Sequence, residues 1–288
     1  LYTDTVNDAA FITKNKIIDG PSYQYRFEQP QGVRNADISQ NIVFHKGTAR
    51  FKRKINGTVF SLLTGGAGNS NYWHWLFDVL PRLKILDNKL DYSNIDYFLF
   101  PDFKERFQRE TLELLNIPSS KIISSKAYRH IEAKKIIAVD HPYVLKNNPT
   151  LEIQNIPHWI LNFLKSEFLK VNQEKKFPQK FYIDRSDSKS NHRYLRKVLN
   201  EDEVKNFLIN KGFSIIALSE LSFLDQINLF HNAKEIVGLH GAGFANLIFS
   251  KPGTFVLEFK SEIAAPVIGN LAIKSGCNFR QMSIKPEL

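Results

Sequence analysis

Short apolar segments alternate with amphipathic segments along most of this sequence, and this alternation restricts the possible folds more than any other feature. The pattern predicts strands at residues 96–100, 135–139, 180–185, 213–218, 235–239 and 254–259. It predicts helices at residues 72–86, 103–115, 158–171, 200–211, 222–232 and 244–249. Strands that are separated by helices pair in parallel through crossover connections. The sequence therefore predicts an α/β fold with largely parallel sheets.

A polar, charged segment at residues 172–180 interrupts the alternation and contains Pro178. This composition is typical of a linker, so we expect two domains, residues 1–173 and residues 174–288. The second domain carries a βαβαβ arrangement, the usual half of a nucleotide-binding fold. The first 60 residues have a mixed pattern, with β-like pieces at residues 41–44 and 57–63.

The composition is that of an ordinary globular protein with a basic surface. Of 288 residues, 43% are hydrophobic and 24% are charged, and the formal net charge is +10. One cysteine, Cys277, excludes an internal disulfide framework and a cysteine-rich metal site. No zinc-finger or RNA-recognition signature occurs, so nucleic acid is not an expected partner. The scattered lysines leave two explanations open, a solvated basic surface and an anionic membrane surface as partner.

The turn after the predicted strand 235–239 has almost no side chains, since it contains His240, Gly241, Ala242 and Gly243. It lies at the carboxyl end of a strand and opens a helix, where free N–H groups attract phosphate. Glu258, at the end of the next predicted strand, is a candidate acceptor for ribose hydroxyls. Tight packing of strand on helix explains the glycines equally well, so both explanations stay open at this point.

Three other glycine motifs do not fit. No G-x-x-x-x-G-K-[ST] run occurs, so a P-loop is excluded. A hydrolase oxyanion turn would need a G-x-S-x-G elbow, but the stretch Gly68–Tyr72 lacks the final glycine. The dehydrogenase fingerprint G-x-G-x-x-G is also absent.

The predicted helix at residues 72–86 places three polar side chains on one face, because His74, Asp78 and Arg82 are spaced four apart. An aspartate held against a histidine can act as a general base. A surface ion pair on an amphipathic helix is the alternative. Pro81 is unusual, since it should end or kink this helix.

A basic stretch follows the predicted strand at residues 180–185, with Arg185, Lys189, Arg193 and Arg196. Guanidinium groups suit bidentate contacts with phosphate. A solvated basic loop explains the same residues. The carboxylates of this stretch are not spaced as D-x-D, so we expect no divalent-metal site.

Together and in order, these stretches resemble family 61 glycosyltransferases. That family typically carries an N-Y-[YW]-H-W helix with D-x-L-P-R-L, a V-G-x-H-G-A-G turn and a P-G-T-x-V-[LI]-E strand. The matching segments here are Asn71–Leu83, Tyr182–Arg185 with Arg193, Asn200–Glu203, Gly212–Phe213, Gln226–Phe230, Val237–Phe249 and Pro252–Glu258. The resemblance covers roughly residues 60–260.

The resemblance implies a GT-B-like fold, in which two Rossmann-like domains face a cleft, and inverting transfer of a sugar from a nucleotide-activated donor. It implies Asp78 as the base with His74 beside it, on the acceptor side. On the donor side it implies Arg185, Arg193, His240, Gly241, Ala242, Gly243, Asn246 and Glu258. Arginines and helix dipoles would then stabilise the departing phosphate, so we expect metal-independent transfer without a further cofactor.

The resemblance and the composition also predict a setting. The chain is short and poor in cysteine, shows no apolar run of membrane-spanning length and has no signal pattern, although a segment could precede Leu1. We therefore expect a bacterial-type enzyme of capsular or other surface polysaccharide synthesis. It would be cytoplasmic, working at the inner face of the membrane on a glycan or a lipid-linked acceptor.

Two other classes of protein remain open from the sequence. One is a sugar-nucleotide enzyme of another reaction on the same scaffold, such as an epimerase or a phosphorylase. The other is a non-catalytic protein that binds a nucleotide or a glycan. The donor nucleotide is also open, and with a CMP-activated sugar the leaving group would be a monophosphate.

Overall fold

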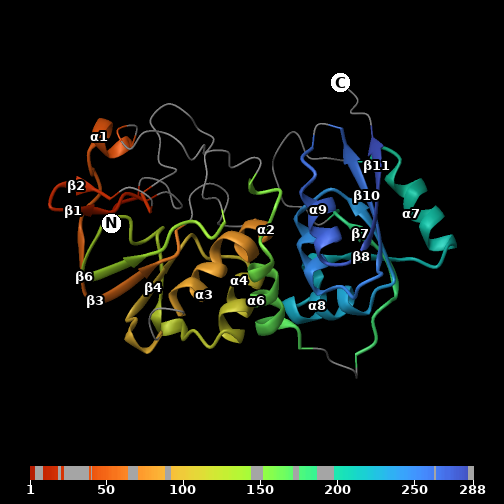
Figure 1. The fold of residues 1–288 in the computed structure, drawn as a ribbon, viewed down its shortest axis with the longest axis horizontal. Helices are drawn as coiled ribbons and strands as arrows, with labels where there is room; N and C mark the ends of the chain where they lie inside the picture. Colours follow the sequence, from red (N-terminus) through yellow and green to blue (C-terminus); the bar gives the residue numbers. More distant parts are fainter. Residues whose placement is uncertain are drawn as a thin grey trace. The chain divides into compact units, whose positions relative to one another are not determined.

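The computed structural model describes residues 1–3, 9–18, 21–22, 39, 41–63, 71–87, 92–143, 152–170, 175–186, 198–262 and 264–284 (Figure 1). The chain divides into two compact units, residues 1–153 and residues 154–288. Helix α6 (His158–Phe168) belongs to the second unit, where it packs against the 3₁₀ helix η6 (Ala242–Phe249). The domain boundary between residues 173 and 174 stays a prediction.

The first unit is built on a parallel sheet with the strand order β5-β4-β3-β6. Its strands are β3 (Arg53–Ser61), β4 (Tyr97–Phe100), β5 (Ile122–Ser124) and β6 (Ile131–Ala138), and a two-stranded sheet of β1 (Ile12–Thr13) and β2 (Lys16–Ile17) stands apart. Its helices are α1 (Ile42–Lys46), α2 (Tyr72–His74), α3 (Pro81–Asp87) and α4 (Arg106–Leu114), with the π-helical turn η2 (Trp75–Val79) and the 3₁₀ turns η3 (Tyr92–Asn94) and η4 (Ser119–Lys121). In chain order these strands run 3-2-1-4, so the order reverses between β3 and β6. Ligands of open α/β sheets bind at the carboxyl edge of such a reversal.

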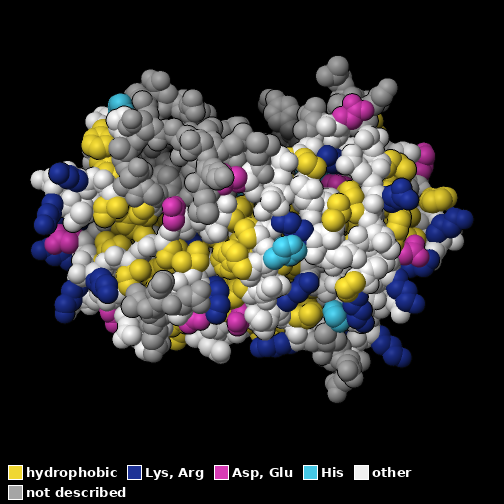
Figure 2. Space-filling view, in the orientation of Figure 1, with side chains coloured by type: hydrophobic (Ala, Val, Ile, Leu, Met, Phe, Trp, Pro, Cys, Tyr) yellow, Lys and Arg dark blue, Asp and Glu magenta, His cyan; other side chains and the backbone are white. Residues whose placement is uncertain are grey.

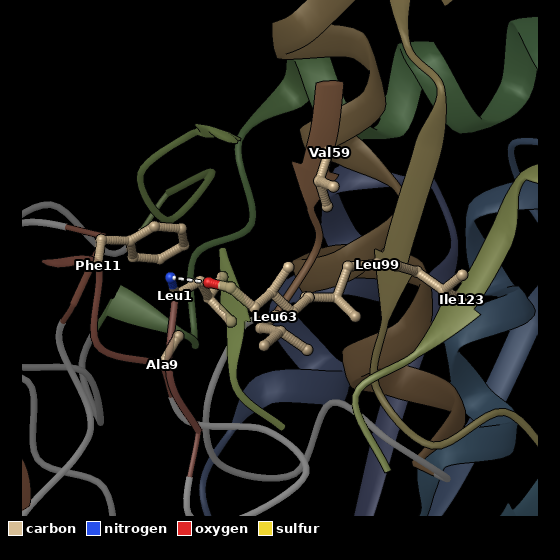
Figure 3. Packing of buried hydrophobic residues seen from close by; sticks show 8 residues of the cluster. Leu1, Ala9, Phe11, Val59, Leu63, Leu99 and Ile123 are labelled. Atoms are coloured by element: carbon tan, nitrogen blue, oxygen red, sulfur yellow. Dashed lines mark hydrogen bonds between the residues drawn. The ribbon is translucent and has the colours of Figure 1, made fainter. Parts of the chain in front are cut away.

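One hydrophobic cluster of this unit joins its first residues to the sheet. Leu1, Ala9 and Phe11 pack with Val59, Leu63, Leu99, Ile123 and Ile131 of the strands and their ends (Figure 3). All eight side chains are buried. The cluster includes residues of all four strands, and so it packs the N-terminal residues against the sheet whose carboxyl edge carries the polar residues described below.

The second unit is built on a five-stranded parallel sheet with the order β11-β10-β9-β7-β8. Its strands are β7 (Lys180–Asp184), β8 (Ser214–Ala217), β9 (Glu235–Leu239), β10 (Phe255–Ser261) and β11 (Asn278–Ile284). Its helices besides α6 and η6 are α7 (Glu201–Asn210), α8 (Phe223–Asn232) and α9 (Val267–Lys274), with the 3₁₀ turn η5 (Leu218–Glu220). In chain order the strands run 2-1-3-4-5, and the order reverses between β7 and β9.

Helices cover both faces of this second sheet, with α7 on one side and α9 on the other (Figure 1). Leu208 of α7 packs with Tyr182, Val237 and Phe259 on the first face. On the opposite face, the rings of Phe181 and Phe230 of α8 meet at 5.2 Å. Neighbouring residues along a strand point to opposite faces, so each residue of β7, β9 and β10 can be assigned to one face.

The prediction of an α/β fold with parallel sheets is confirmed. The predicted helix that follows Asn200 is α7, and Gly212 beyond its end has a φ of 82°. The β-like assignment of residues 41–44 was wrong, because α1 begins at Ile42 and the side chain of Asn41 caps it by accepting from the N–H of Val43. The GT-B arrangement of the two domains stays a prediction.

Basic side chains are spread over the molecular surface. On the face drawn in Figure 2, Lys and Arg side chains (dark blue) lie at several places across the surface, with fewer Asp and Glu side chains (magenta) among them. Among the described residues, no helix combines the length and the apolar character that crossing a bilayer would need. Binding to an anionic membrane surface stays a prediction.

Candidate functional site

The helical segment that starts at Tyr72 changes its winding in the middle. Asn71 caps it, since its side chain accepts from the N–H of Trp73 at 3.0 Å. The N–H of Leu80 then donates to the carbonyl of Trp75 at 3.1 Å, a bond that skips one more residue than in an α-helix. Pro81 begins α3, where its missing N–H costs no bond. The irregularity predicted from Pro81 is therefore a π-helical turn, a feature frequent at functional sites.

Asp78 lies in this π-helical turn and is 6% exposed. Its Oδ2 is 2.6 Å from Nδ1 of His74, and its Oδ1 accepts from the hydroxyl of Tyr143 at 2.6 Å. The Nε2 atom of His141 is 3.8 Å from Oδ2. Polar side chains from the helix and from the segment after β6 therefore surround one buried carboxylate.

The hydrogen bonds assign the protons of both histidines. Nδ1 of His141 accepts from the backbone N–H of Tyr143 at 3.3 Å, so its proton is on Nε2 and faces Asp78. His74 donates from Nδ1 to the carboxylate, so in the neutral ring Nε2 carries a lone pair. Within the described ranges, Nε2 of His74 has no hydrogen-bond partner, and this side chain is 21% exposed. His74 thus has an accepting nitrogen that solvent can reach.

These contacts shift two pKa values in opposite directions. Burial opposes the charge of Asp78, but the charge of His74 and the hydrogen bonds from both histidines outweigh it and hold the pKa of Asp78 far below its usual range. Burial lowers the pKa of His74, yet the charge of Asp78 and the hydrogen bond to it prevail, so the net pKa of His74 is raised. The pair therefore stays an aspartate beside a basic imidazole over a wide range of pH.

Arg82 fastens this cluster to the sheet. It is 2% exposed, and its Nε donates to the carbonyl of Asp78 at 3.1 Å. Its Nη1 donates to the carbonyls of Leu63 and Val139, each at 3.1 Å. Leu63 lies two residues beyond β3 and Val139 directly follows β6, and these are the strands at which the order of the first sheet reverses. The predicted pairing of His74 with Asp78 is confirmed, whereas Arg82 is buried and binds backbone carbonyls at the strand ends.

In the second unit, the turn after β9 presents backbone N–H groups. Within the described part of the chain, the N–H groups of Gly241, Ala242 and Gly243 have no protein acceptor. The guanidinium of Arg185 lies over the turn, where its Nη1 donates to the carbonyl of His240 at 2.7 Å. A Cβ atom on Gly241 would be 3.2 Å from Cζ and Nη1 of Arg185, so a residue without a side chain lets the cation approach.

A pocket of about 180 Å³ opens beside this turn, between the ends of β7 and β9 where the strand order reverses. Its lining residues are Ile183, Asp184, Arg185, Leu218, Leu239, Gly241, Ala242, Gly243 and Phe244. The one carboxylate of the lining, Asp184, accepts from Nζ of Lys205 at 2.9 Å. The apolar walls, the guanidinium and the free N–H groups make this pocket suited to an anion attached to a flat or apolar group.

Two residues expected to touch the donor lie deeper than the turn. Glu258 is 1% exposed, and its Oε1 is hydrogen-bonded to Nδ1 of His240. Asn246 is fully buried, and its amide donates to Gln226 at 3.0 Å and to the carbonyl of Gly243 at 3.3 Å. In this structure Glu258 is hydrogen-bonded to His240 and Asn246 to Gly243, so both residues support the turn. Their direct contact with a ligand stays a prediction.

Arg193 and the glycine-rich stretch at residues 64–70 lie outside the described residues. Within the described ranges, no three His, Cys, Asp or Glu side chains gather as ligands for one metal ion. The structure also adds His141 and Tyr143, which the sequence analysis missed. Their signal was a polar run, Asp140–Tyr143, directly after a predicted strand, at the edge where sites of α/β sheets lie.

Comparison with known proteins shows that one family model includes residues of both sites. A family model described as "Glycosyltransferase 61" matches residues 72–257, a range that includes His74, Asp78 and the turn at residues 240–243. A mouse (Mus musculus) "EGF domain-specific O-linked N-acetylglucosamine transferase" is 38% identical over 68 residues, which cover 22% of this chain and 13% of that relative. The proteins of the same description from dog (Canis lupus familiaris) and cattle (Bos taurus) are 37% identical over 70 residues and 35% identical over 68 residues, with the same coverage. The chain therefore matches only a small part of the length of these relatives.

Proposed function

This chain belongs to glycosyltransferase family 61, and from that membership we propose that it transfers a sugar, with inversion, from a nucleotide-activated donor to a hydroxyl group of a glycan or a lipid-linked acceptor. The observation that carries this proposal is the extent of the family match, which spans both the His74–Asp78 pair and the turn at residues 240–243. A base and an anion site are the two groups that an inverting transfer needs. The proposal includes the GT-B arrangement, in which the two units face a common cleft.

The donor would bind in the second unit. Its phosphates would accept hydrogen bonds from the free N–H groups of Gly241, Ala242 and Gly243 and would meet the guanidinium of Arg185. Arg193 would add a second cation. The pocket beside the turn would take the group attached to the phosphates, and Glu258 and Asn246 would support this site through His240 and Gly243.

The acceptor would bind in the first unit, where proton transfer can be divided between His74 and Asp78 in two ways. In the hypothesis from the sequence, Asp78 is the base that accepts the proton of the acceptor hydroxyl. The hydrogen bonds favour Nε2 of His74 as the base, because Asp78 has donors on both of its oxygens and a strongly lowered pKa. In this division Asp78 positions His74 and stabilises the imidazolium that forms, while Tyr143 and His141 hold Asp78.

The reaction then balances without a metal ion. Nε2 of the neutral His74 takes the proton of the acceptor hydroxyl as that oxygen attacks the anomeric carbon. The bond from this carbon to the phosphate oxygen breaks, and the phosphate leaves with the electron pair. Arg185 and the N–H groups of the turn stabilise the charge on the leaving phosphate. Activity that EDTA abolishes and manganese restores would contradict this part of the proposal.

The acceptor and the cellular setting are the finer part of the proposal. We favour surface polysaccharide synthesis of the bacterial type, in the cytoplasm at the inner face of the membrane, because the chain is basic and would suit anionic or lipid-linked acceptors. The relatives described as O-linked N-acetylglucosamine transferases support a second candidate, transfer of N-acetylglucosamine to a protein hydroxyl. Nucleotide-activated N-acetylglucosamine is therefore the first donor to test.

The test has two stages. A thermal-shift screen with UDP, GDP, TDP, CMP and their sugars, in buffer with EDTA, identifies the donor, because a ligand at about 100 times its Kd stabilises by about 2.7 kcal/mol. Mass spectrometry then detects transfer from that donor to an oligosaccharide, a lipid-linked phosphate or a peptide that contains an EGF domain. Transfer by the wild type that His74→Gln abolishes supports the proposal. Epimer formation without transfer, or binding without turnover, would contradict it.

A further inference from the structure

Lys260 of β10 is a buried cation beside the turn after β9. It lies two residues beyond Glu258, so both side chains point to the same face of the second sheet. Phe259 pairs with Leu239, and the N–H of His240 donates to the carbonyl of Phe259 at 2.8 Å. The parallel pairing of β9 with β10 therefore continues one residue beyond β9, and this places His240 beside Lys260.

The ring of His240 is on this same face, since it is hydrogen-bonded to Glu258. The face is covered by η6 and α9. A Cβ on Gly238, which pairs with Glu258, would be 3.1 Å from the ring of Phe244 in η6. A Cβ on Gly269 of α9 would be 2.8 Å from the ring of Phe279, which pairs with Val256. Lys260 thus lies on the face between these helices and the sheet, one residue before the carboxyl end of β10.

The ammonium of Lys260 differs from the other buried charges of the two sites. Arg82, Asp78 and Glu258 each have a hydrogen-bond partner. Lys260 is 5% exposed, and within the described residues it forms no hydrogen bond or ion pair. Among the described side chains, only the hydroxyl oxygens of Ser250 and Ser275 are fully enclosed and lack a hydrogen-bond partner. The Nζ atom of Lys260 is therefore not fully enclosed. A covered stem therefore holds the charge where solvent or a ligand can reach it.

The stem of Lys260 is buried, with the residue at 5% exposure, and no protein partner among the described residues offsets the hydration that its ammonium loses. Such a group is kept where an anion supplies the missing partner. α9 is the next element after β10 in the chain, so the N-terminus of that helix, which also favours negative charge, follows the carboxyl end of β10. Each of these features calls for an anion next to His240.

We infer that Lys260 is a further anion-binding residue of the donor site, where its ammonium binds a phosphate oxygen of the nucleotide-sugar together with the N–H groups of the turn and Arg185. The inference rests on the proposed function and deepens it. Lys260 would hold the phosphate in the ground state and stabilise the charge that develops on it when the glycosidic bond breaks. A compact ammonium on a buried stem approaches from the sheet, while Arg185 lies over Gly241.

The inference is tested with Lys260→Met, which keeps the length of the stem and removes the charge, and with Lys260→Arg, which keeps the charge. Lys251→Met is the matched control, because Lys251 is exposed and precedes β10 at the opposite edge of the sheet. Calorimetry in buffer with EDTA measures the Kd for inorganic pyrophosphate and for the nucleotide that stabilises the wild type. Thermal unfolding without ligand measures the stability of each variant.

We expect Lys260→Met to weaken binding of both probes about 10- to 100-fold, while its unliganded Tm is equal to or above that of the wild type. Lys260→Arg should stay within about fivefold, and Lys251→Met should leave both quantities unchanged. Wild-type affinity of Lys260→Met for pyrophosphate would overturn the inference. A lower unliganded Tm of Lys260→Met, with weakened binding that Lys260→Arg fails to restore, would also overturn it, since the stem would then serve packing alone.

The two proposals fail in different ways. Sugar transfer that proceeds at the wild-type rate in Lys260→Met removes Lys260 from the site and leaves the proposed function intact. A wild type that binds pyrophosphate through Lys260 but transfers no sugar from any donor supports the anion site and contradicts the proposed function.

Discussion

The two units place a polar site at the same point of a parallel sheet, the carboxyl edge where the strand order reverses, but they build it from different parts of the chain. In the first unit the site consists of side chains, with Asp78 held by His74 and Tyr143 and anchored through Arg82. In the second unit it consists largely of backbone, the turn at residues 241–243, with Arg185 over it.

This difference teaches what each kind of site is suited to. A network of buried side chains sets pKa values and tautomers, so it suits proton transfer, and its residues also contribute to the stability of the fold. A bare turn offers fixed donors without titration, so it suits an anion. Substitutions in the first unit should therefore affect stability and pH dependence, and substitutions in the second unit should affect binding.

The largest effect is expected from Asp78→Asn, which should lower kcat/KM about 10²- to 10⁴-fold, because the amide no longer holds His74 with its proton on Nδ1. Loss of the negative charge also lowers the pKa of His74, so the acid limb of the residual activity should move to lower pH. The pH profile of kcat/KM checks both effects. Asp87→Asn, at an exposed carboxylate of α3 that pairs with Lys84, is the control and should change neither.

The same variant tests the stability of the first unit. The pKa of Asp78 is lowered in the folded chain, so its contribution to the free energy of unfolding is present above about pH 4 and is lost as the pH falls further. The pKa of His74 is raised, so its contribution is present below about pH 6.5 and is lost as the pH rises through the folded value. The free energy of unfolding, measured in urea at several pH values, should lose both of these pH dependences in Asp78→Asn. An unchanged pH dependence would contradict the interaction between His74 and Asp78.

The next effect is that of Arg82→Met, which should lower the free energy of unfolding by about 3–5 kcal/mol, because buried carbonyls of two strand ends lose a charged donor. Chemical denaturation measures this change. Arg106→Met is the control, since that guanidinium is 55% exposed and pairs with Glu110 on the helix surface. The control should change stability by no more than about 0.5 kcal/mol. Equal effects of the two variants would refute the role of Arg82 as an anchor.

A smaller effect is expected from Tyr143→Phe, which removes a donor from the carboxylate of Asp78 and should cost about 1.5–3 kcal/mol of stability. The less stabilised carboxylate attracts the imidazolium of His74 more strongly, so the acid limb should move to higher pH, opposite to the shift in Asp78→Asn. Tyr92→Phe removes a hydroxyl that donates to the neutral carbonyl of Leu83, so it should leave the pH profile unchanged. An acid limb that moves to lower pH, as in Asp78→Asn, would contradict the role of Tyr143 as a donor to the carboxylate of Asp78.

The smallest effect should be that of Gly241→Ala in the second unit. The added Cβ meets the guanidinium of Arg185 at 3.2 Å and moves it, so we expect a nucleotide Kd about 10-fold higher with stability nearly unchanged. Gly212→Ala should do the reverse, because its φ of 82° strains any side chain, at a cost of about 1 kcal/mol, while the donor site is untouched. A Gly241→Ala variant with a lowered Tm but a wild-type Kd for the nucleotide would contradict the contrast between the units.

Much of the fold was predictable from the sequence, since strand and helix periodicity follows from local burial. Helix α1 was not, because the apolar residues after Asn41 suit a strand as well as a capped helix. The strands β5 and β11 were also missed. They are short or lie at an edge of their sheet, and pairing rather than pattern defines them.

The sequence by itself determined which residue types are available for chemistry: a histidine and an aspartate four apart, a bare turn after a strand, and arginines nearby. Spacing along one helix or one turn fixes such relations locally. Only the tertiary structure decided that His141 and Tyr143 join Asp78, that Glu258 supports His240, and that Lys260 is buried with no partner among the described residues. These contacts cross 18 to 65 residues of chain and depend on strand register and crossover connections, which no local pattern encodes.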